Sequence, residues 1–309
     1  MSHIRAQANR SPATARIEQC EARMFLSVAA KVAADPPAPL PGGEVRVYEP
    51  HSTVRGQTMA EWTQDWWKWA WSIPEDPTNN TLPNPVYENP LNDPNGSLAY
   101  LGRQDKVFFL GGVYKIITDP ATPTVYRTRT IAAPTGMPIL FPVLNAASSA
   151  ARPTRPQTAE GLINLVDNVN MPLAHDAFAS LNGVAIQDVA SYTEPSGIFE
   201  ASFPANNIYS VPVDRQNQPW ISYSNGYWIM LQPLSPGQYT LHFGGAFGAT
   251  FALDVTYNIT IVPQGLYNKN PYAPWPSPQA EAVKAKSAFS DVKIARNPVL
   301  AEDPPSVLG

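Results

Sequence analysis

The sequence predicts a mostly β protein: a single antiparallel β-sandwich or jelly-roll-like domain with a tryptophan-rich helix and one or two further inserted helices. Three observations predict this class. The 309 residues suffice for one large all-β domain. Proline accounts for 34 residues, about twice its usual share of about 5%. Many short stretches alternate apolar and polar side chains between turn-forming residues, which is typical of sandwiches.

Composition excludes several classes of protein. Charged residues make up 15% of the chain and the net charge is −4, whereas a nucleic-acid binder usually carries a basic patch or stripe. No apolar run approaches the roughly 20 residues that span a bilayer, so we expect no transmembrane helix. Cys20 is the single cysteine, which excludes an internal disulfide and a cysteine-based zinc cluster.

A proline-rich linker is predicted over residues 35–44, and the apolar run in residues 1–34 is too short and interrupted for a Sec signal peptide. Residues 17–27 combine Ile17, Glu18, Glu21 and Arg23 with the run Phe25-Leu26-Ser27. This stretch resembles the LEPR-XLL segment of exported and surface proteins in some bacterial groups, although Ala22 replaces the usual proline. The resemblance implies that residues 1–34 are an export leader and that the protein is extracellular, at the cell surface or periplasmic. The alternative is a frayed amphipathic helix.

Periodicity and turn residues then divide the chain into elements. Helices are predicted at 56–73, 158–171 and 174–181, and residues 74–97 are predicted to form a loop. Strands are predicted at 45–48, 106–117, 124–132, 138–144, 184–192, 198–203, 208–213, 220–223, 226–233, 237–246 and 250–262. The sandwich domain therefore covers 45–264. A polar, proline-containing tail with a short helix at 279–290 covers 265–309.

The first predicted helix holds five of the eight tryptophans within ten residues. Trp62, Trp66 and Trp69 share one face of it, and Trp67 and Trp71 lie on another. Three interpretations follow: a structural helix packed on a sheet, an aromatic platform for sugar rings, or a helix docked at a membrane interface. We expect the structural role.

The predicted strand 226–233 has apolar residues in both alternating sets, which indicates burial on both faces. Trp228 and Met230 lie on one side, and Tyr227, Ile229 and Leu231 on the other. We expect the tryptophan helix to cover the Trp228 side, so that Trp62, Trp66, Trp69 and Trp228 form a structural cluster.

Three segments together resemble an uncharacterised bacterial exported family. They are residues 56–74 (GQTMAEWTQDWWKWAWSIP), 138–145 (PILFPVLN) and 226–245 (GYWIMLQPLSPGQYTLHFGG). They occur in the order that this family shows and span about 190 residues of the chain. The resemblance implies no catalytic residue. Ala146, Ala147 and Ser148 stand where relatives often place an acidic residue or a cysteine, which argues against a carboxylate site there.

The sequence contains no nucleophile elbow, phosphate loop, zinc-protease motif or cysteine pair. The candidate catalytic groups are His242, Glu200 and Asp254, all on predicted strands. His175 and Asp176 could also act as an acid–base pair, but adjacent residues of a predicted helix point apart. No cofactor or metal site is predicted, apart from a weak calcium candidate at Asp93 and Asn95 in a turn-rich loop.

An aromatic and amide cluster is the alternative to a catalytic site. It comprises Trp220, Tyr223, Asn225 and Tyr227, with His242 nearby if these strands pair as a hairpin. Aromatic rings stack on sugar faces while amides bond the hydroxyls. Three functions stay open: a non-enzymatic exported protein that binds an extracellular glycan or envelope polymer, a hydrolase or lyase that acts on such a polymer, and a structural envelope protein. We favour the first.

Overall fold

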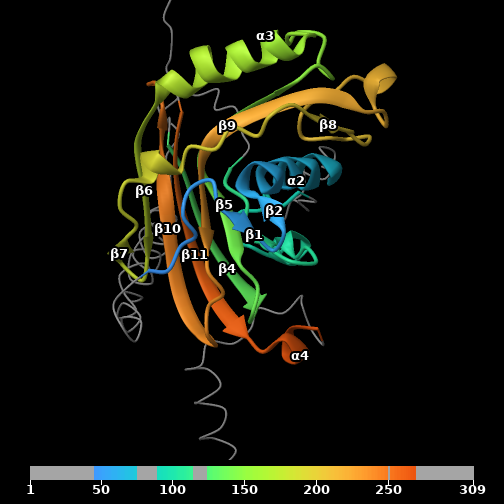
Figure 1. Cartoon of the computed structure of the whole chain (residues 1–309). Coiled ribbons are helices and arrows are strands. Elements are labelled where there is room, and N and C mark those ends of the chain that lie inside the picture. Colours follow the sequence, from blue (N-terminus) through green and yellow to red (C-terminus); the bar gives the residue numbers. More distant parts are fainter. Residues whose placement is uncertain (1–44, 75–88, 114–123, 250, 269–309) are drawn as a thin grey trace, which may run out of the picture. The chain divides into compact units, whose positions relative to one another are not determined.

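The chain folds mostly into β-strands with few helices, as predicted (Figure 1). The computed structural model describes residues 45–74, 89–113, 124–249 and 251–268, which belong to one compact unit. The predicted leader, linker and C-terminal helix lie outside the described residues, as does most of the predicted loop 74–97.

Two larger sheets and a short hairpin hold the strands. The five-stranded sheet has the order β4 (Thr124–Pro134), β11 (Phe251–Val262), β10 (Gly237–Phe247), β6 (Ala174–Leu181) and β7 (Val184–Ala185). The four-stranded sheet has the order β3 (Phe108–Phe109), β5 (Ile139–Ser149), β9 (Trp220–Leu231) and β8 (Phe199–Ala201). The hairpin joins β1 (Thr53–Val54) to β2 (Gln57–Thr58).

The sheets are mixed, which corrects the purely antiparallel prediction. β4 runs parallel to β11 over its whole length, and β3 runs parallel to β5. The other neighbours are antiparallel. The connection between two strands decides whether they run parallel, because a parallel pair needs a long crossover connection and cannot be joined by a short hairpin. More than a hundred residues separate β4 from β11.

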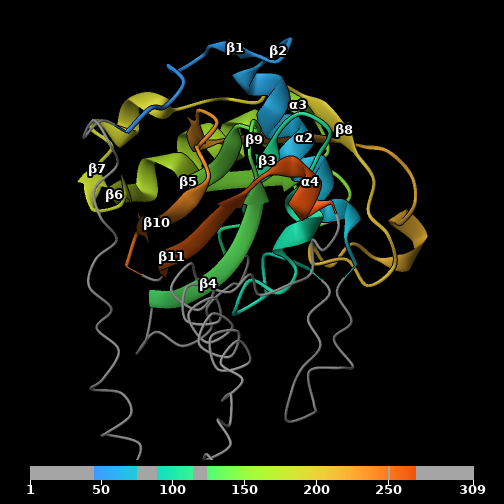
Figure 2. The same cartoon turned by 90° about the horizontal axis from the view of Figure 1, so that it is seen from below.

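A shared core lies between the two sheets. Leu241 and Phe243 of β10 and Val255 of β11 pack in one cluster with Phe141 of β5 and Ile229 of β9. Figures 1 and 2 show α2 (Met59–Ser72) on the other side of β5 and β9. The four-stranded sheet is therefore buried on both faces, as continuous apolar strands require.

Helix α2 begins at Met59, three residues after the predicted start at 56, because Thr58 caps it. The Thr58 side chain accepts a hydrogen bond from the Glu61 N–H (3.2 Å), and the Glu61 carboxylate accepts one from the Thr58 N–H (2.8 Å). This reciprocal capping box satisfies two otherwise unpaired donors. The helix ends at Ser72, two residues before Pro74, because proline cannot continue it.

The tryptophans of α2 form a structural cluster, as predicted. Trp66 is 1% exposed, and its ring centroid lies 5.2 Å from that of Trp228, which is also 1% exposed. Trp62 and Trp69 lie in the same cluster. On the other side of the helix, Trp71 packs against Phe203 and Tyr209. With no tryptophan of the helix more than 8% exposed, the platform and membrane interpretations of α2 are wrong.

Strand β9 joins two predicted strands, 220–223 and 226–233, into one. Gly226 lies in its middle, where the backbone of β5 approaches very closely. A Cβ atom at this position would lie 2.5 Å from Cα of Asn145. Glycine therefore permits the close pairing of β9 with β5 instead of interrupting the strand.

The second predicted helix forms as α3 (Ala159–Ile163), which continues as the π-helical segment η3 (Asn164–Asn170) and the 3₁₀ turn η4 (Met171–Leu173). Leu162 and Val166 face inward and pack on Tyr223 of β9. The third predicted helix, 174–181, is wrong, because this segment is strand β6. Its alanines favour a helix locally, but hydrogen bonds to β10 decide the outcome.

Five predicted strands are shorter or missing, and one of them, 198–203, keeps only Phe199–Ala201. Of 106–117, only Phe108–Phe109 is a strand within the described residues, and 45–48 keeps a single bridge at Val47. Segment 184–192 ends its strand at Ala185 and turns into η5 (Val189–Tyr192). Segment 208–213 is a turn that leads into η6 (Val213–Arg215), because the Asn207 side chain accepts a hydrogen bond from the Val211 N–H and Pro212 follows.

The described part also contains two further short helices, η2 (Ala99–Gly102) and α4 (Gln264–Tyr267).

Candidate functional site

The outer face of the five-stranded sheet brings together the most chemically varied exposed side chains. One row across this face runs Phe178 of β6, Gly244 of β10, Asp254 of β11 and Tyr126 of β4. Tyr126 is 69% exposed and Phe178 is 37% exposed. Two exposed aromatic rings on one face of a sheet offer apolar surface to a ligand.

A histidine–carboxylate pair lies between the two aromatics. Nε2 of His242 lies 2.9 Å from Oδ1 of Asp254, and both side chains are about one-third to two-fifths exposed (40% and 34%). Within the described part of the chain, Nδ1 of His242 and Oδ2 of Asp254 make no further hydrogen bond. Each is therefore available to a bound molecule.

Glycine makes room for the aromatic beside this pair. A Cβ atom at Gly244 would lie 2.9 Å from the Phe178 ring and 2.2 Å from the Leu253 carbonyl oxygen. The Phe178 ring therefore lies over the bare backbone of Gly244. This ring and the His242 imidazole meet in an edge-to-face arrangement, with centroids 4.8 Å apart, which is a favoured geometry for ring pairs.

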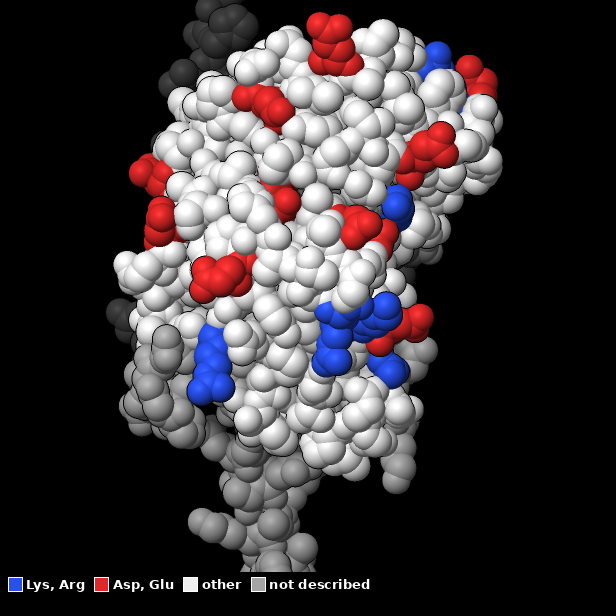
Figure 3. Space-filling model, in the orientation of Figure 1, with Lys and Arg blue, Asp and Glu red and all other residues white. Residues whose placement is uncertain are grey.

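Small hydroxyl and amide side chains complete the outer face. The neighbouring rows contain Ser180, Thr256 and Thr128, then Thr240, Asn258 and Thr130. Such groups both donate and accept hydrogen bonds, so they suit a ligand rich in hydroxyls. In the orientation of Figure 1, Figure 3 shows Lys, Arg, Asp and Glu side chains scattered between wide uncharged areas, and it does not mark the rows of the outer face.

Of the predicted catalytic residues, the structure unites His242 with Asp254 and leaves Glu200 apart. Glu200 is exposed on β8 and pairs with Ile221 in the four-stranded sheet. A glycosidase needs two carboxylates about 5–10 Å apart across a cleft. Because Glu200 and Asp254 belong to different sheets and His242 lies on an open face, this arrangement offers hydrogen bonding more readily than acid–base catalysis.

The predicted aromatic cluster is not one surface, because β9 and β10 lie in different sheets and form no hairpin. Trp220 packs toward α2, with the Arg215 guanidinium 4.5 Å from its ring centre. Tyr227 is half-buried in the core between the sheets. Of the five predicted binding residues, His242 alone lies on the outer face of the five-stranded sheet.

The remaining two predicted binding residues are buried beneath η3. Both carboxylate oxygens of Asp167 are used: one accepts a hydrogen bond from the Tyr223 hydroxyl (2.7 Å), the other from the Asn225 amide (2.9 Å). Burial, together with the Asp167 carboxylate, raises the pKa of Tyr223 well above its usual range. These residues thus attach the π-helical segment to β9.

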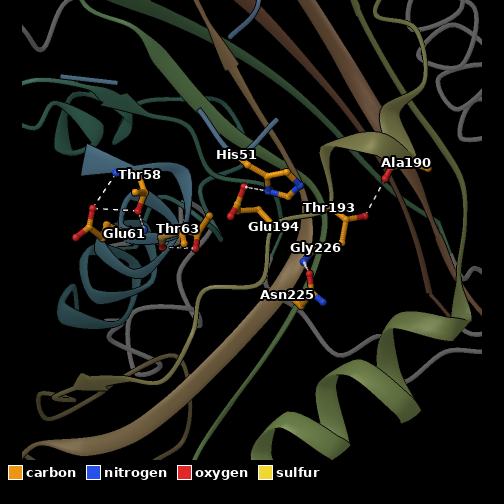
Figure 4. Close-up of polar contacts among 10 residues, drawn as sticks. His51, Thr58, Glu61, Thr63, Ala190, Thr193, Glu194, Asn225 and Gly226 are labelled. Carbon is orange, nitrogen blue, oxygen red and sulfur yellow. Dashed lines mark hydrogen bonds and ion pairs between the residues drawn. The ribbon is translucent and has the colours of Figure 1, made fainter. Parts of the chain in front are cut away.

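A second histidine–carboxylate pair escaped the sequence analysis. Nδ1 of His51 lies 2.8 Å from Oε2 of Glu194, and Figure 4 shows the two side chains pointing toward one another. His51 lies in the turn before β1 with a φ of 58°, and Glu194 binds the Gly226 carbonyl through its N–H. Nothing in the sequence pairs residues 143 positions apart. The pair joins the N-terminal turn to the segment beside β9.

This pair makes stability depend on pH. Burial raises the pKa of Glu194 above its ordinary value of 4.5, and His51 opposes part of that rise. The folded state therefore binds the proton of the Glu194 carboxyl more tightly than the unfolded state does. The stabilisation that this protonated carboxyl gives below pH 4.5 is lost as the pH rises through the raised pKa.

We expect Glu194→Gln to flatten the fall in unfolding free energy from pH 4.5 toward neutral pH, measured by urea denaturation. Glu200→Gln, at an exposed carboxylate, is the control and should follow the wild-type profile; an unchanged profile in Glu194→Gln contradicts the assignment.

A groove of about 370 Å³ runs along α2, lined by Trp62, Trp69 and Phe109 with Asp65, Lys68, Ser72 and Gln104. Its aromatic residues are at most 8% exposed, and the indole N–H groups of Trp62 and Trp69 already donate to backbone carbonyls. The groove thus offers little ring surface to a ligand.

The predicted calcium candidates serve their own loop. The Asp93 carboxylate is buried and accepts hydrogen bonds from the N–H groups of Asn95 (3.1 Å) and Leu98 (2.7 Å). Across the described ranges, no three His, Cys, Asp or Glu side chains cluster so as to hold a metal ion. In those same ranges, no helix is both long and apolar enough to cross a membrane.

Comparison with known proteins leaves the family open. No protein-family model matches the chain, and no curated protein matches it. Among solved structures, the chain is similar to one from "Structure of PbICP-C in complex with falcipain-2", with 11% identity and a TM-score of 0.21. The similarity covers 51% of this chain and 99% of that one, and at this TM-score it supports no conclusion about fold or function.

Proposed function

We propose that this chain is an exported, non-enzymatic β-sandwich protein that binds carbohydrate on the outer face of its five-stranded sheet. The observation that carries the proposal is the His242–Asp254 pair, which lies on an open face between the exposed rings of Tyr126 and Phe178. Aromatic rings with a few fixed polar groups are the usual means of holding a sugar. The LEPR-XLL-like segment supports export.

The site differs from the cluster that the sequence suggested. Stacking needs exposed ring faces, and Tyr223 is 4% exposed whereas Tyr126 is 69% exposed. A sugar whose hydroxyls face the sheet would bring them to Nδ1 of His242 and Oδ2 of Asp254. Calcium and other cofactors have no part in this proposal.

The test is a binding screen of the chain from Asp35 onward against glycans and envelope polymers, with and without calcium, that scores both retention and product release. We expect retention without turnover, and about tenfold weaker binding in Tyr126→Ala, which corresponds to about 1.4 kcal/mol. Val213→Ser, at an 84% exposed residue of η6, is the surface control and should bind like the wild type.

Two other functions have their own outcomes in this screen. The close contact of His242 with Asp254 (2.9 Å) also favours a hydrolase or lyase that acts on an extracellular polymer. Product release that is lost in His242→Gln would establish that enzyme and overturn the binding protein. Neither retention nor turnover on any polymer would leave a structural envelope protein.

A further inference from the structure

The two exposed aromatics of the outer face lie too far apart for one sugar ring. Phe178 and Tyr126 occupy the two ends of a row that crosses four neighbouring strands. Adjacent strands lie about 4.8 Å apart, so three spacings separate these positions by about 14 Å. A ligand that contacts both rings must therefore be an oligomer of several rings, and it must run across the strands.

The same face has histidine–carboxylate pairs in place of permanent cations. His242 contacts Asp254, and His175 of β6, opposite Ala246 of β10, lies 2.8 Å from the neighbouring Asp176. Among the described outward residues of these strands there is no Lys or Arg. An anionic polymer would meet a carboxylate at the centre of the face and no permanent cation to balance its charge. Hydroxyls and amides suit an uncharged polymer instead.

We propose that the outer face selects an uncharged, extended polysaccharide that lies across the strands, with Phe178 and Tyr126 as its two outer stacking positions. The His242–Asp254 pair lies between them and bonds the hydroxyls of the central rings. Gly244 makes room for the Phe178 stacking position, because it places no side chain where that ring lies. This inference rests on the proposed function and adds the class of ligand, its direction and its minimum length.

The first arm of the experiment tests charge. The chain is passed over immobilised neutral polymers (cellulose, xylan, mannan and β-1,3-glucan) and anionic ones (alginate and polygalacturonate). Each is tested at low salt and at about 1 M salt, where the Debye length falls to about 3 Å. We expect one or more neutral polymers to retain the protein equally at both salt concentrations, and the anionic polymers not to retain it.

The second arm tests length and direction with oligomers of the retained polymer, from the disaccharide to the hexasaccharide, by calorimetry. Affinity is expected to rise by about tenfold, or about 1.4 kcal/mol, once the oligomer spans from Phe178 to Tyr126. Tyr126→Ala and Phe178→Ala should each remove this rise and leave the disaccharide affinity within about twofold. Val213→Ser should keep the wild-type length dependence. Tyr126 is the decisive position, because at 69% exposure its removal leaves the fold intact.

The outcomes separate this inference from the proposed function. Retention on an anionic polymer that is lost in Tyr126→Ala, or a disaccharide that binds as tightly as the hexasaccharide, overturns the inference and leaves carbohydrate binding standing. Retention that none of the outer-face variants weakens, or no retention on any polymer, overturns both.

Discussion

Replacing Trp66 with alanine is expected to lower the free energy of unfolding by about 3–5 kcal/mol. Trp66 is 1% exposed and contacts the rings of Trp67, Trp69 and Trp228 at centroid distances of 5.0–5.5 Å. Its indole N–H also donates to the Leu110 carbonyl oxygen at 2.9 Å. The substitution leaves a large cavity at the junction of α2 with β9 and removes the partner of a buried carbonyl.

Urea denaturation followed by tryptophan fluorescence and circular dichroism measures this loss. Val213→Ala serves as the control, because an 84% exposed side chain contributes less than about 0.5 kcal/mol. A loss below about 1 kcal/mol in Trp66→Ala would mean that the tryptophan cluster does not anchor the helix. Trp66→Phe keeps most of the packing and should lose less than Trp66→Ala, which separates the cavity from the hydrogen bond.

Arg129→Met is expected to be at least as destabilising, with a loss of about 3 kcal/mol or more. Arg129 lies on β4, is 1% exposed, and points into the interior. Its guanidinium donates to the carbonyl oxygens of Leu91, Asp93, Gly111 and Gly112 and to the Tyr257 hydroxyl, at 2.7–3.2 Å. Each buried acceptor left without a donor costs about 1–3 kcal/mol.

These bonds attach the segments 89–95 and 110–113 to the five-stranded sheet. We therefore expect Arg129→Met to loosen these segments locally as well as to lower the free energy of global unfolding. We expect limited proteolysis of Arg129→Met to cleave first in these segments. Arg129→Lys should fail to restore stability, because lysine offers three donors from one point in place of a planar fork. Arg55→Met is the control: the Arg55 side chain is exposed and, among the described residues, donates one hydrogen bond, to the Gly136 carbonyl oxygen. Equal protease resistance in Arg129→Met and Arg55→Met would contradict the role of Arg129.

The candidate site could be predicted from the sequence only in part. His242 and Asp254 stood on the polar sides of two well-marked strands, and both lie on the outer face. The sequence does not indicate Tyr126, because Arg127 and Arg129 obscure the alternation of β4, in which arginine takes an interior position. It does not indicate Phe178 either, because that segment has the composition of a helix.

The sequence by itself determined the features that depend on neighbours along the chain. Pro74 set the end of α2, and the alternation over 250–262 set strand β11 and its buried face. The double apolar pattern of 226–233 correctly indicated a strand covered on both sides, with α2 against Trp228. Such signals are local, because helix and strand periods are repeated within a few residues.

The tertiary structure alone decided which strands are neighbours, and the site depends on that choice. β6 is a strand because β10 supplies its hydrogen-bond partners, and β4 lies beside β11 in parallel although more than a hundred residues separate them. These pairings place Phe178, His242, Asp254 and Tyr126 on one face, and they put Tyr223 beneath η3. Backbone hydrogen bonds and burial between distant segments produce no periodic pattern in the sequence. The neighbours of each strand are therefore decided only when the sheets assemble.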